Sequence, residues 1–167
     1  NTIVQSMGTS KEKVVESILK RNEDSELYKK KIKSILRKVA PLIAKSVISE
    51  AKITPVGNVK IYSIHDEQLD DDYHISVGEK SVEIDKSLIY VAVFTKGEGI
   101  SVIVFAGDNA NKLIKAGTIA KEISVQLGGS GGGSERFGQG GGSIKYKEKI
   151  NDALLSVEEL VVRHSKE

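Results

Sequence analysis

Apolar residues recur every three or four positions over the first third of the chain, a spacing that predicts one long helix. The recurrence runs from Val15 to Leu42 in steps that mostly alternate between three and four, as in the seam of two paired helices. Roughly 40 residues at 1.5 Å each would make a helix about 60 Å long, too long for a small domain to cover. The seam therefore predicts contact with another helix, either in a second copy of the chain or in a hairpin within one chain.

The helical arm, residues 1–54, carries signals for its start and for two irregularities. Thr9 and Glu12 have the spacing of a capping box and predict where the helix begins. The seam turns polar at residues 21–25, where we expect a bend or break. Pro41 lacks a main-chain donor and costs about 3 kcal/mol inside a helix, so we expect a kink over residues 37–41.

The remainder of the chain, residues 55–167, alternates between strand-like and helix-like patterns. The unbroken apolar run over residues 87–94 is typical of a strand buried on both faces. Residues 73–85 are ambiguous, because helical spacing competes there with strand-like alternation. We expect strands over 58–64, 87–94 and 100–106, a helix that Asp108 or Asn109 caps and that ends at Leu127, and a last helix that Ser143 caps. This order predicts a small α/β domain (α+β-like, with helices packed on a sheet) preceded by a long α-helical arm.

Nine of the sixteen glycines lie within residues 128–142. An ordered glycine loses roughly 0.5–1 kcal/mol more than alanine on folding, so an ordered segment of this composition is costly. One interpretation is a flexible Gly/Ser linker, which the opening residues resemble. The other is a main-chain cradle that lets a phosphate-rich partner approach closely. The charged and aromatic insert, residues 135–139, favours the cradle, because a linker needs no such residues.

The same segment carries a resemblance to a known family. A helix ending in Leu127 is followed by Gly-Gly-x-Gly-Gly-Gly, a short insert, then Phe137, Gly138, Gln139 and further glycines before another helix. This order resembles the glycine-rich signature of the DHH-associated domain, in the form found in the C-terminal domain of alanyl-tRNA synthetases of the dimerising, archaeal type. The resemblance covers essentially the whole chain.

The resemblance implies a tRNA-binding domain, residues 55–167, that contacts the outer corner of tRNA-Ala, and a homodimer. The arm, residues 1–54, is the candidate dimerisation segment, and the sequence leaves open whether the dimer uses the arm, the globular domain or both. The dimer-interface residues would be Tyr28, Ile32, Ile35, Leu36, Val39, Leu42 and Ile43. Many relatives carry Lys or Arg where this chain has Ser130 and Ser134, so the cationic role passes to Arg136 or to neighbouring helices.

The candidate RNA-binding residues combine the glycines with nearby basic side chains. The start of the last helix favours an anion, because its N–H groups lack partners and its dipole is positive there. Phe137 serves either as a hydrophobic plug that pins the segment or as a platform for an exposed base, and the plug is the simpler role. The assigned residues are Gly128, Gly129, Gly131, Gly132, Gly133, Arg136, Phe137, Gln139, Gly141, Gly142, Lys112, Lys115, Lys145 and Lys147.

Charge is unevenly distributed along the chain. Residues 11–54 carry twelve basic and six acidic side chains, whereas residues 55–99 carry four basic and nine acidic ones. The basic surplus of the arm is compatible with a nucleic-acid partner, but a solvated helix face explains it more simply.

The composition excludes several classes of protein. There is no cysteine, so neither a disulfide framework nor a thiolate metal site is available. No apolar run approaches the 18–20 residues that span a bilayer, and no secretory signal is present. We therefore expect a cytoplasmic protein with no membrane partner, and the start at Asn1 suggests part of a longer chain.

No residue of this chain is assigned to catalysis or to a metal. His65 and Asp66 are adjacent on a predicted strand and so point to opposite faces, and the acidic run Asp70–Asp72 is more typical of a helix start than of a metal site. We expect no cofactor here, while the resemblance implies ATP and an editing-domain zinc in the longer parent protein.

Two functions remain open from the sequence. The first is the tRNA-binding and dimerisation region of an alanyl-tRNA synthetase. The alternative is the substrate-binding half of a DHH-family phosphoesterase that acts on short nucleotides. The glycine motif of those enzymes typically continues into His, where this chain has Ser134, and this difference favours the first.

Overall fold

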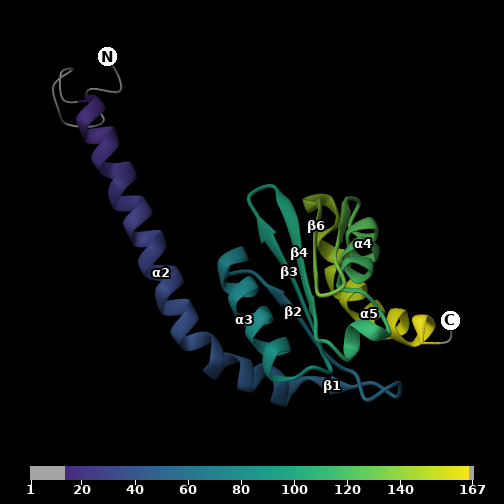
Figure 1. Cartoon of the computed structure of the whole chain (residues 1–167). Helices are drawn as coiled ribbons and strands as arrows, with labels where there is room; N and C mark the ends of the chain where they lie inside the picture. The colour runs from purple at the N-terminus through teal and green to yellow at the C-terminus, as the bar shows by residue number, and fades with distance from the viewer. Residues whose placement is uncertain (1–13, 166–167) are drawn as a thin grey trace. The chain divides into compact units, whose positions relative to one another are not determined.

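The computed structural model describes residues 14–165, with side chains from Lys20 onward (Figure 1). It forms two compact units that divide between Lys38 and Val39. The predicted capping box at Thr9 and Glu12 lies outside the described residues.

Helix α2 (Val14–Glu50) is common to both units and confirms the long predicted helix. It is uninterrupted at residues 21–25, so the predicted break there is wrong. Polar seam positions weaken packing against a partner but leave the i→i−4 hydrogen bonds of a helix intact. Pro41 lies inside α2, close to the division between the two units.

The last turns of α2 belong to the second unit, and this moves the boundary that the sequence placed between residues 54 and 55. Ala40, Ala44 and Val47 are buried there, and Ala40 and Val47 pack in the same apolar cluster as the sheet residue Tyr90. The apolar positions of this stretch therefore serve the core of the second unit.

The second unit is built on a mixed six-stranded sheet, which confirms the predicted fold class. Its strands are β1 (Lys52–Ile53), β2 (Lys60–Asp66), β3 (Leu88–Lys96), β4 (Gly99–Ala106), β5 (Ser130–Gly133) and β6 (Phe137–Ser143). They lie in the order β1-β2-β3-β4-β6-β5, with β2 and β3 parallel and the other neighbours antiparallel. The first seven residues of β3 are buried, as their apolar run predicted.

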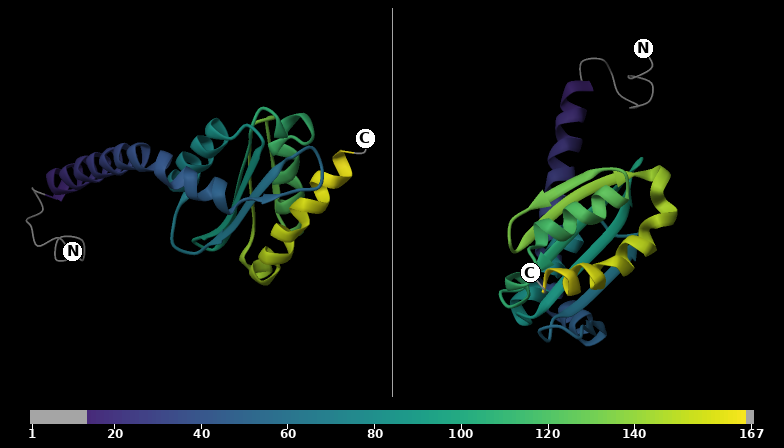
Figure 2. Two further views of the ribbon diagram at one scale, coloured as in Figure 1. Left: turned by 90° about the horizontal axis from the view of Figure 1, so that it is seen from below. Right: turned by 90° about the vertical axis from the view of Figure 1, so that its right-hand side faces the viewer.

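Helices cover both faces of this sheet. Helix α3 (Asp71–Ile84) packs on β3 and β4 on one face, whereas α4 (Ala116–Gln126) and α5 (Ile150–His164) share the other face. Figure 2 shows α4 and α5 together on that second side. Two apolar clusters result, one beneath α4 and α5 and one beneath α3.

Helix α3 settles the ambiguous stretch at residues 73–85. Asp70 caps it, since its carboxylate accepts a hydrogen bond from Tyr73 N at 3.3 Å. Asp71 and Asp72 follow in the first turn, where the helix dipole favours negative charge. The acidic run is therefore a helix start, as expected.

Helix α4 begins later than the sequence predicted. Residues 110–112 form a short 3-10 turn, η2 (Ala110–Lys112), and α4 starts at Ala116. The prediction that Asp108 or Asn109 caps a single helix is wrong. Asn109 precedes η2 but forms no side-chain capping hydrogen bond, and Asp108 forms ion pairs with Lys86 and Arg136.

Candidate nucleic-acid interface

The glycine-rich segment folds as a β-hairpin of β5 and β6, which corrects the expectation of a loop. Ser134 closes the turn: its main-chain N–H donates to Phe137 O at 2.7 Å, and its Oγ accepts from Phe137 N at 3.2 Å. Strand β6 lies between β4 and β5. The main-chain N–H groups of β6 therefore serve the sheet, and the expectation that they are free for phosphates is wrong.

On one face, the hairpin is glycine-rich because α4 packs directly on its main chain. A Cβ at Gly138 would lie 2.5 Å from Ala116 O, and one at Gly142 would lie 2.6 Å from Leu127 O. Gly117 of α4 also allows the helix and the hairpin to approach closely, since a Cβ at Gly117 would lie 2.6 Å from Gly133 O.

On the opposite face, no intramolecular contact explains the glycine at position 132. Gly132 pairs with Gln139, and both belong to the face that carries α3. A Cβ at Gly132 would meet no atom of the described protein within 4 Å, and its φ lies outside the left-handed region. Gly141, on the same face, would bring a Cβ only against Ile100 O, at 3.0 Å. The open face, as we name the surface of Ser130, Gly132, Gln139 and Gly141, therefore exposes nearly bare main chain.

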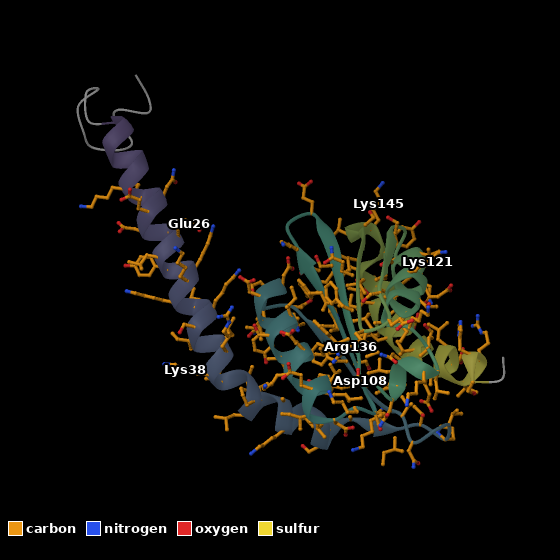
Figure 3. All side chains as sticks on the ribbon, viewed as in Figure 1. Glu26, Lys38, Asp108, Lys121, Arg136 and Lys145 are labelled. Atoms are coloured by element: carbon orange, nitrogen blue, oxygen red, sulfur yellow. The ribbon has the colours of Figure 1, made fainter. Side chains whose placement is uncertain are left out.

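The hairpin has a shallow depression at each end. One is lined by Ile100, Gly128, Gly129, Ser130, Gly141, Gly142 and Ser143. The other is lined by Lys115, Gly133, Ser134, Glu135 and Arg136. The seven residues of β6 separate the two by roughly 20 Å, and Figure 3 shows Lys145 and Arg136 toward opposite ends. The structure thus divides the predicted RNA-binding residues into two groups.

Acidic neighbours neutralise most of the predicted basic residues. Arg136 Nε lies 3.2 Å from Asp108 Oδ1. The ammonium groups of Lys115 and Lys147 lie 3.3 Å from Glu135 and 2.8 Å from Glu67, respectively, and the hydrogen bond to Glu67 raises the pKa of Lys147.

Lys112 and Lys145 are exposed and form no ion pair with any residue of the described part of the chain. Lys145 is two residues from Ser143, at the glycine-lined depression. It is therefore the predicted cation best placed to meet a phosphate there.

Of the two helix starts next to the hairpin, that of α4 is already occupied, and that of the last helix is displaced from the position that the sequence predicted. The first N–H groups of α4, from Ala116 and Gly117, donate to Glu135 O and Ser134 O at 2.9 Å each. Between β6 and α5 lies a second 3-10 segment, η3 (Ile144–Lys149), so Lys145 and Lys147 do not belong to the first turn of α5. Ser143 caps this segment, accepting from Lys145 N at 3.4 Å, and does not cap α5.

Phe137 and Gln139 have different surroundings. The Phe137 ring is half-buried, with its centroid 4.9 Å from that of Phe105, an arrangement that fits the plug interpretation. Gln139 is exposed and lines a small cavity beside α3.

The sequence did not predict a buried polar cluster beneath α3, which consists of His74, Tyr90 and Asp66. His74 is fully buried, with its Nδ1 2.9 Å from Tyr90 Oη and its Nε2 3.6 Å from Asp66 Oδ2. Asp66 thus faces His74 and not its sequence neighbour His65. Burial lowers the pKa of His74, against the opposing effect of Asp66, and burial raises the pKa of Tyr90. Only the fold brings these residues together, and no local motif signals them.

The predicted dimer-interface residues fall on both units. In the first unit, Tyr28, Ile32 and Ile35 are exposed and Leu36 is half-buried. In the second unit, Leu42 is exposed and Val39 is half-buried, while Ile43 packs against the cluster beneath α3. Ile43 is therefore at least partly used within the chain.

Across residues 14–165, no three His, Cys, Asp or Glu side chains are placed to share a metal ion. Within the same range, no helix combines the length and the apolar character needed to cross a bilayer.

Comparison with known proteins places this geometry in a family. The family model of the DHHA1 domain matches residues 56–163. The chain is 32% identical over 156 residues to the alanine--tRNA ligase of Nitrosopumilus maritimus (strain SCM1), covering 92% of this chain and 17% of that protein. It is 40% identical over 91 residues to the alanine--tRNA ligase of Cenarchaeum symbiosum (strain A), covering 54% of this chain and 9% of that protein. The chain therefore spans only a small part of the length of these relatives.

A solved structure has the same fold. The C-Ala domain of Aquifex aeolicus alanyl-tRNA synthetase superposes with a TM-score of 0.59 at 19% identity, covering 67% of this chain and 97% of that domain. The glycine-rich hairpin, α3 and α4 lie within the residues that the family model matches, and so does all of α5 except His164. The chain belongs to the DHHA1 domain family and is homologous to alanine--tRNA ligases over most of its length.

Proposed function

We propose that this chain is the C-terminal tRNA-binding and dimerisation region of an alanyl-tRNA synthetase. Its open face would contact the outer corner of tRNA-Ala and position the tRNA for the rest of the enzyme. ATP-dependent ligation of alanine and zinc-dependent editing would take place in other parts of the longer, cytoplasmic protein.

The observation that carries this proposal is the open position of Gly132. Glycines 138, 140 and 142 are explained by the approach of α4, but a Cβ at Gly132 would meet no atom of the described protein within 4 Å. Glycine is costly in a strand, so its presence at an edge position with free space indicates an external partner. Bare main chain allows the planar face of a base, or a ribose, to approach the sheet closely.

The charges nearby agree with an RNA partner that meets this face at one end. Lys145 lies beside the glycine-lined depression without an internal ion pair among the described residues. At the other end, Arg136 and Lys115 are held by Asp108 and Glu135. Contact with phosphate is therefore easier near Lys145.

The first unit supplies the candidate dimer contact. Tyr28, Ile32 and Ile35 are 63%, 55% and 59% exposed, and they lie on one side of α2 at steps of four and three residues. Such a stripe is stable in water when it pairs with another helix. A second copy of the chain is the partner that we propose.

A graded series at position 132 tests the RNA contact. Gly132→Ala and Gly132→Val place progressively larger groups on the open face, where a Cβ at Gly132 meets no atom of the described protein within 4 Å. We expect affinity for tRNA-Ala to fall with the size of the side chain while thermal unfolding stays near wild type. A tRNA-Ala transcript with a disrupted corner should bind weakly to all of them, and AMP should bind negligibly. Unchanged tRNA affinity in Gly132→Val would refute this use of the open face, and tight AMP binding would favour the phosphoesterase alternative.

A further inference from the structure

The segment η3 lies at the end of the hairpin that carries the glycine-lined depression, directly after Ser143. It reads Ile-Lys-Tyr-Lys-Glu-Lys, so one aromatic ring is interleaved with three lysines, and all six residues are exposed. Surfaces that bind single-stranded nucleic acid combine these two kinds of side chain, because lysines attract the phosphates and aromatic rings stack on the bases. Tyr146 of this segment lines neither depression of the hairpin, so it would form a contact of its own.

Tyr146 is the one exposed phenylalanine or tyrosine in the described part of the second unit, with 37% of its surface accessible. The other rings are used inside the domain. Phe137 packs against Phe105, with ring centroids 4.9 Å apart. Tyr62 stacks on Tyr90, with centroids 5.6 Å apart. A base that meets an aromatic ring on this unit therefore meets Tyr146.

The end of α4 holds the Tyr146 ring in place. Gly128 follows α4 with a φ of +72°, and a Cβ on Gly128 would overlap the Tyr146 ring. Gly128 N donates to Val125 O at 3.0 Å, and this bond is one of the pair that ends a helix on a left-handed glycine. Gly129 N supplies the other, to Ser124 O at 2.8 Å. Because Gly128 also lines the depression, the ring is seated on fixed main chain beside it.

Two lysines near the ring are available to a phosphate. Lys145 and Lys149 form no ion pair with any described side chain. Lys147, between them, is held by Glu67 at 2.8 Å. Lys149 Nζ lies 5.2 Å from the centroid of the Tyr146 ring. An exposed cation–π contact is weaker than a base stacked on an aromatic ring, so a base can displace this ammonium group.

We propose that Tyr146 is a stacking platform for one base at the outer corner of tRNA-Ala, with Lys145 and Lys149 bound to the flanking phosphates. The base takes the place of the Lys149 ammonium group over the ring, and the adjoining RNA backbone crosses the glycine-lined depression. This inference rests on the tRNA binding proposed above and adds a base contact to it. Because every base has a π face, the contact accepts any base at that position.

Substitutions that keep or remove the ring test the stacking. Tyr146→Phe keeps the ring and should bind tRNA-Ala within about twofold of the wild type. Tyr146→Leu keeps an apolar side chain against Gly128 but has no π face, so affinity should fall about tenfold. The slope of log affinity against log salt should be unchanged in Tyr146→Leu, because no phosphate contact is lost. Thermal unfolding of both variants shows whether the fold is kept.

Lys149→Gln tests the cation separately. It should weaken binding at low salt and lower the slope of log affinity against log salt by about one, as for one lost phosphate contact. Lys121→Gln is the matched control, because Lys121 is an exposed lysine that lines neither depression, and it should change the slope little. An unchanged slope with equal or tighter binding in Lys149→Gln would contradict the phosphate contact.

A fluorescent residue at the platform reports the stacking directly. The chain contains no tryptophan, so Tyr146→Trp introduces a single indole, whose fluorescence is quenched when a base stacks on it. We expect quenching by tRNA-Ala and by a transcript that lacks the unpaired 3′ end, but little quenching by a transcript with a disrupted corner. Quenching that requires the 3′ end would overturn the proposed contact with the corner. Constant fluorescence at saturating tRNA-Ala would overturn the platform itself.

The outcomes separate this inference from the function on which it rests. If Gly132→Val weakens tRNA binding but Tyr146→Leu does not, the open face binds RNA and Tyr146 stacks on no base. If Tyr146→Phe loses as much affinity as Tyr146→Leu, the ring is not the contact, and the platform is refuted. If the wild-type chain fails to bind tRNA-Ala at all, the proposed function fails first.

Discussion

Gly140 of β6 lies directly against Ser124 of α4, so that a Cβ on Gly140 would overlap Ser124 Oγ. The same Cβ would come within 2.8 Å of Gly131 Cα on the neighbouring strand. Ser124 is fully buried, and its hydroxyl has no hydrogen-bond partner in the described protein. The seam between helix and hairpin is therefore so tight that it has no space for a methyl group.

The two faces of the hairpin should respond oppositely to the same substitution. We expect Gly140→Ala to lower the free energy of unfolding by about 1–3 kcal/mol, the usual cost of overpacking. Gly132→Ala adds the same methyl group in open space and should leave stability within about 0.5 kcal/mol. Urea unfolding of the two variants measures the difference. Equal losses would show that the α3-side face is also occupied.

Ser124→Ala should relieve part of the strain in Gly140→Ala. Removing the hydroxyl takes away the atom that the new methyl group overlaps, although Gly131 still crowds it. In the wild-type background, losing an unsatisfied buried hydroxyl should be neutral or stabilising by up to about 1 kcal/mol. A double-mutant cycle by urea unfolding should give a favourable coupling between the two substitutions, and strict additivity would contradict the packing described here.

Charge reversal at Lys145 should weaken tRNA binding more than reversal at Lys121. Lys145 is next to the glycine-lined depression, while Lys121 is exposed on α4 and lines neither depression of the hairpin (Figure 3 labels both residues). We expect Lys145→Glu to reduce affinity about tenfold at low salt and to lower the slope of log affinity against log salt by about one, as for one lost phosphate contact. Lys121→Glu should change both quantities little. If the two variants behave alike, the effect comes from net charge and not from a contact at the hairpin.

The sequence predicted most of the second unit because its signals are local and strong. The buried run of β3, the hairpin with β4 and the acidic start of α3 depend on patterns of a few residues, and all three are present. The break at residues 21–25 and the single helix from Asp108 failed for other reasons. Polar side chains at residues 21–25 leave the hydrogen bonds of the helix intact. Asp108 pairs with Lys86 and Arg136, which are distant in sequence, and a one-dimensional pattern does not reveal such partners.

The candidate site was predictable in composition but not in geometry. The glycines at 128–142 identified the right segment, yet strand pairing with β4 depends on Ile103 and Phe105, more than 30 residues earlier in the chain. The same holds for Gln139 beside α3 and for Asp66 beside His74. Residues that meet through the sheet are distant in sequence and form no local motif.

Lysine substitutions on the first unit should abolish self-association if the arm forms the dimer. Ile32→Lys and Ile35→Lys together replace two exposed apolar residues with good helix formers, so the helix should persist while the stripe becomes charged. We expect sedimentation to show a dimer for the wild type and a monomer for this variant. Leu155→Lys is the matched control, because Leu155 on α5 is also exposed, at 70%. A dimer that survives the double substitution would assign the contact to another surface.

Stability should fall in mild acid because His74 is buried in its neutral form. Burial lowers the pKa of His74 in the folded state, below the value of about 6.5 for an unfolded chain, so the unfolded chain binds the proton more readily. The contribution of His74 is therefore fully present above about pH 6.5 and is lost as the pH falls below it, by at most about 1.4 kcal/mol per pH unit. His74→Gln keeps a group that can hydrogen-bond to Tyr90 Oη but cannot titrate, so its stability should be lower at pH 7.5 and should vary less between pH 7 and pH 5. Urea unfolding of both proteins across this range tests the sign. A wild-type protein that gains stability on acidification would mean that the attraction of Asp66, 3.6 Å from Nε2, outweighs the cost of burying the charged ring.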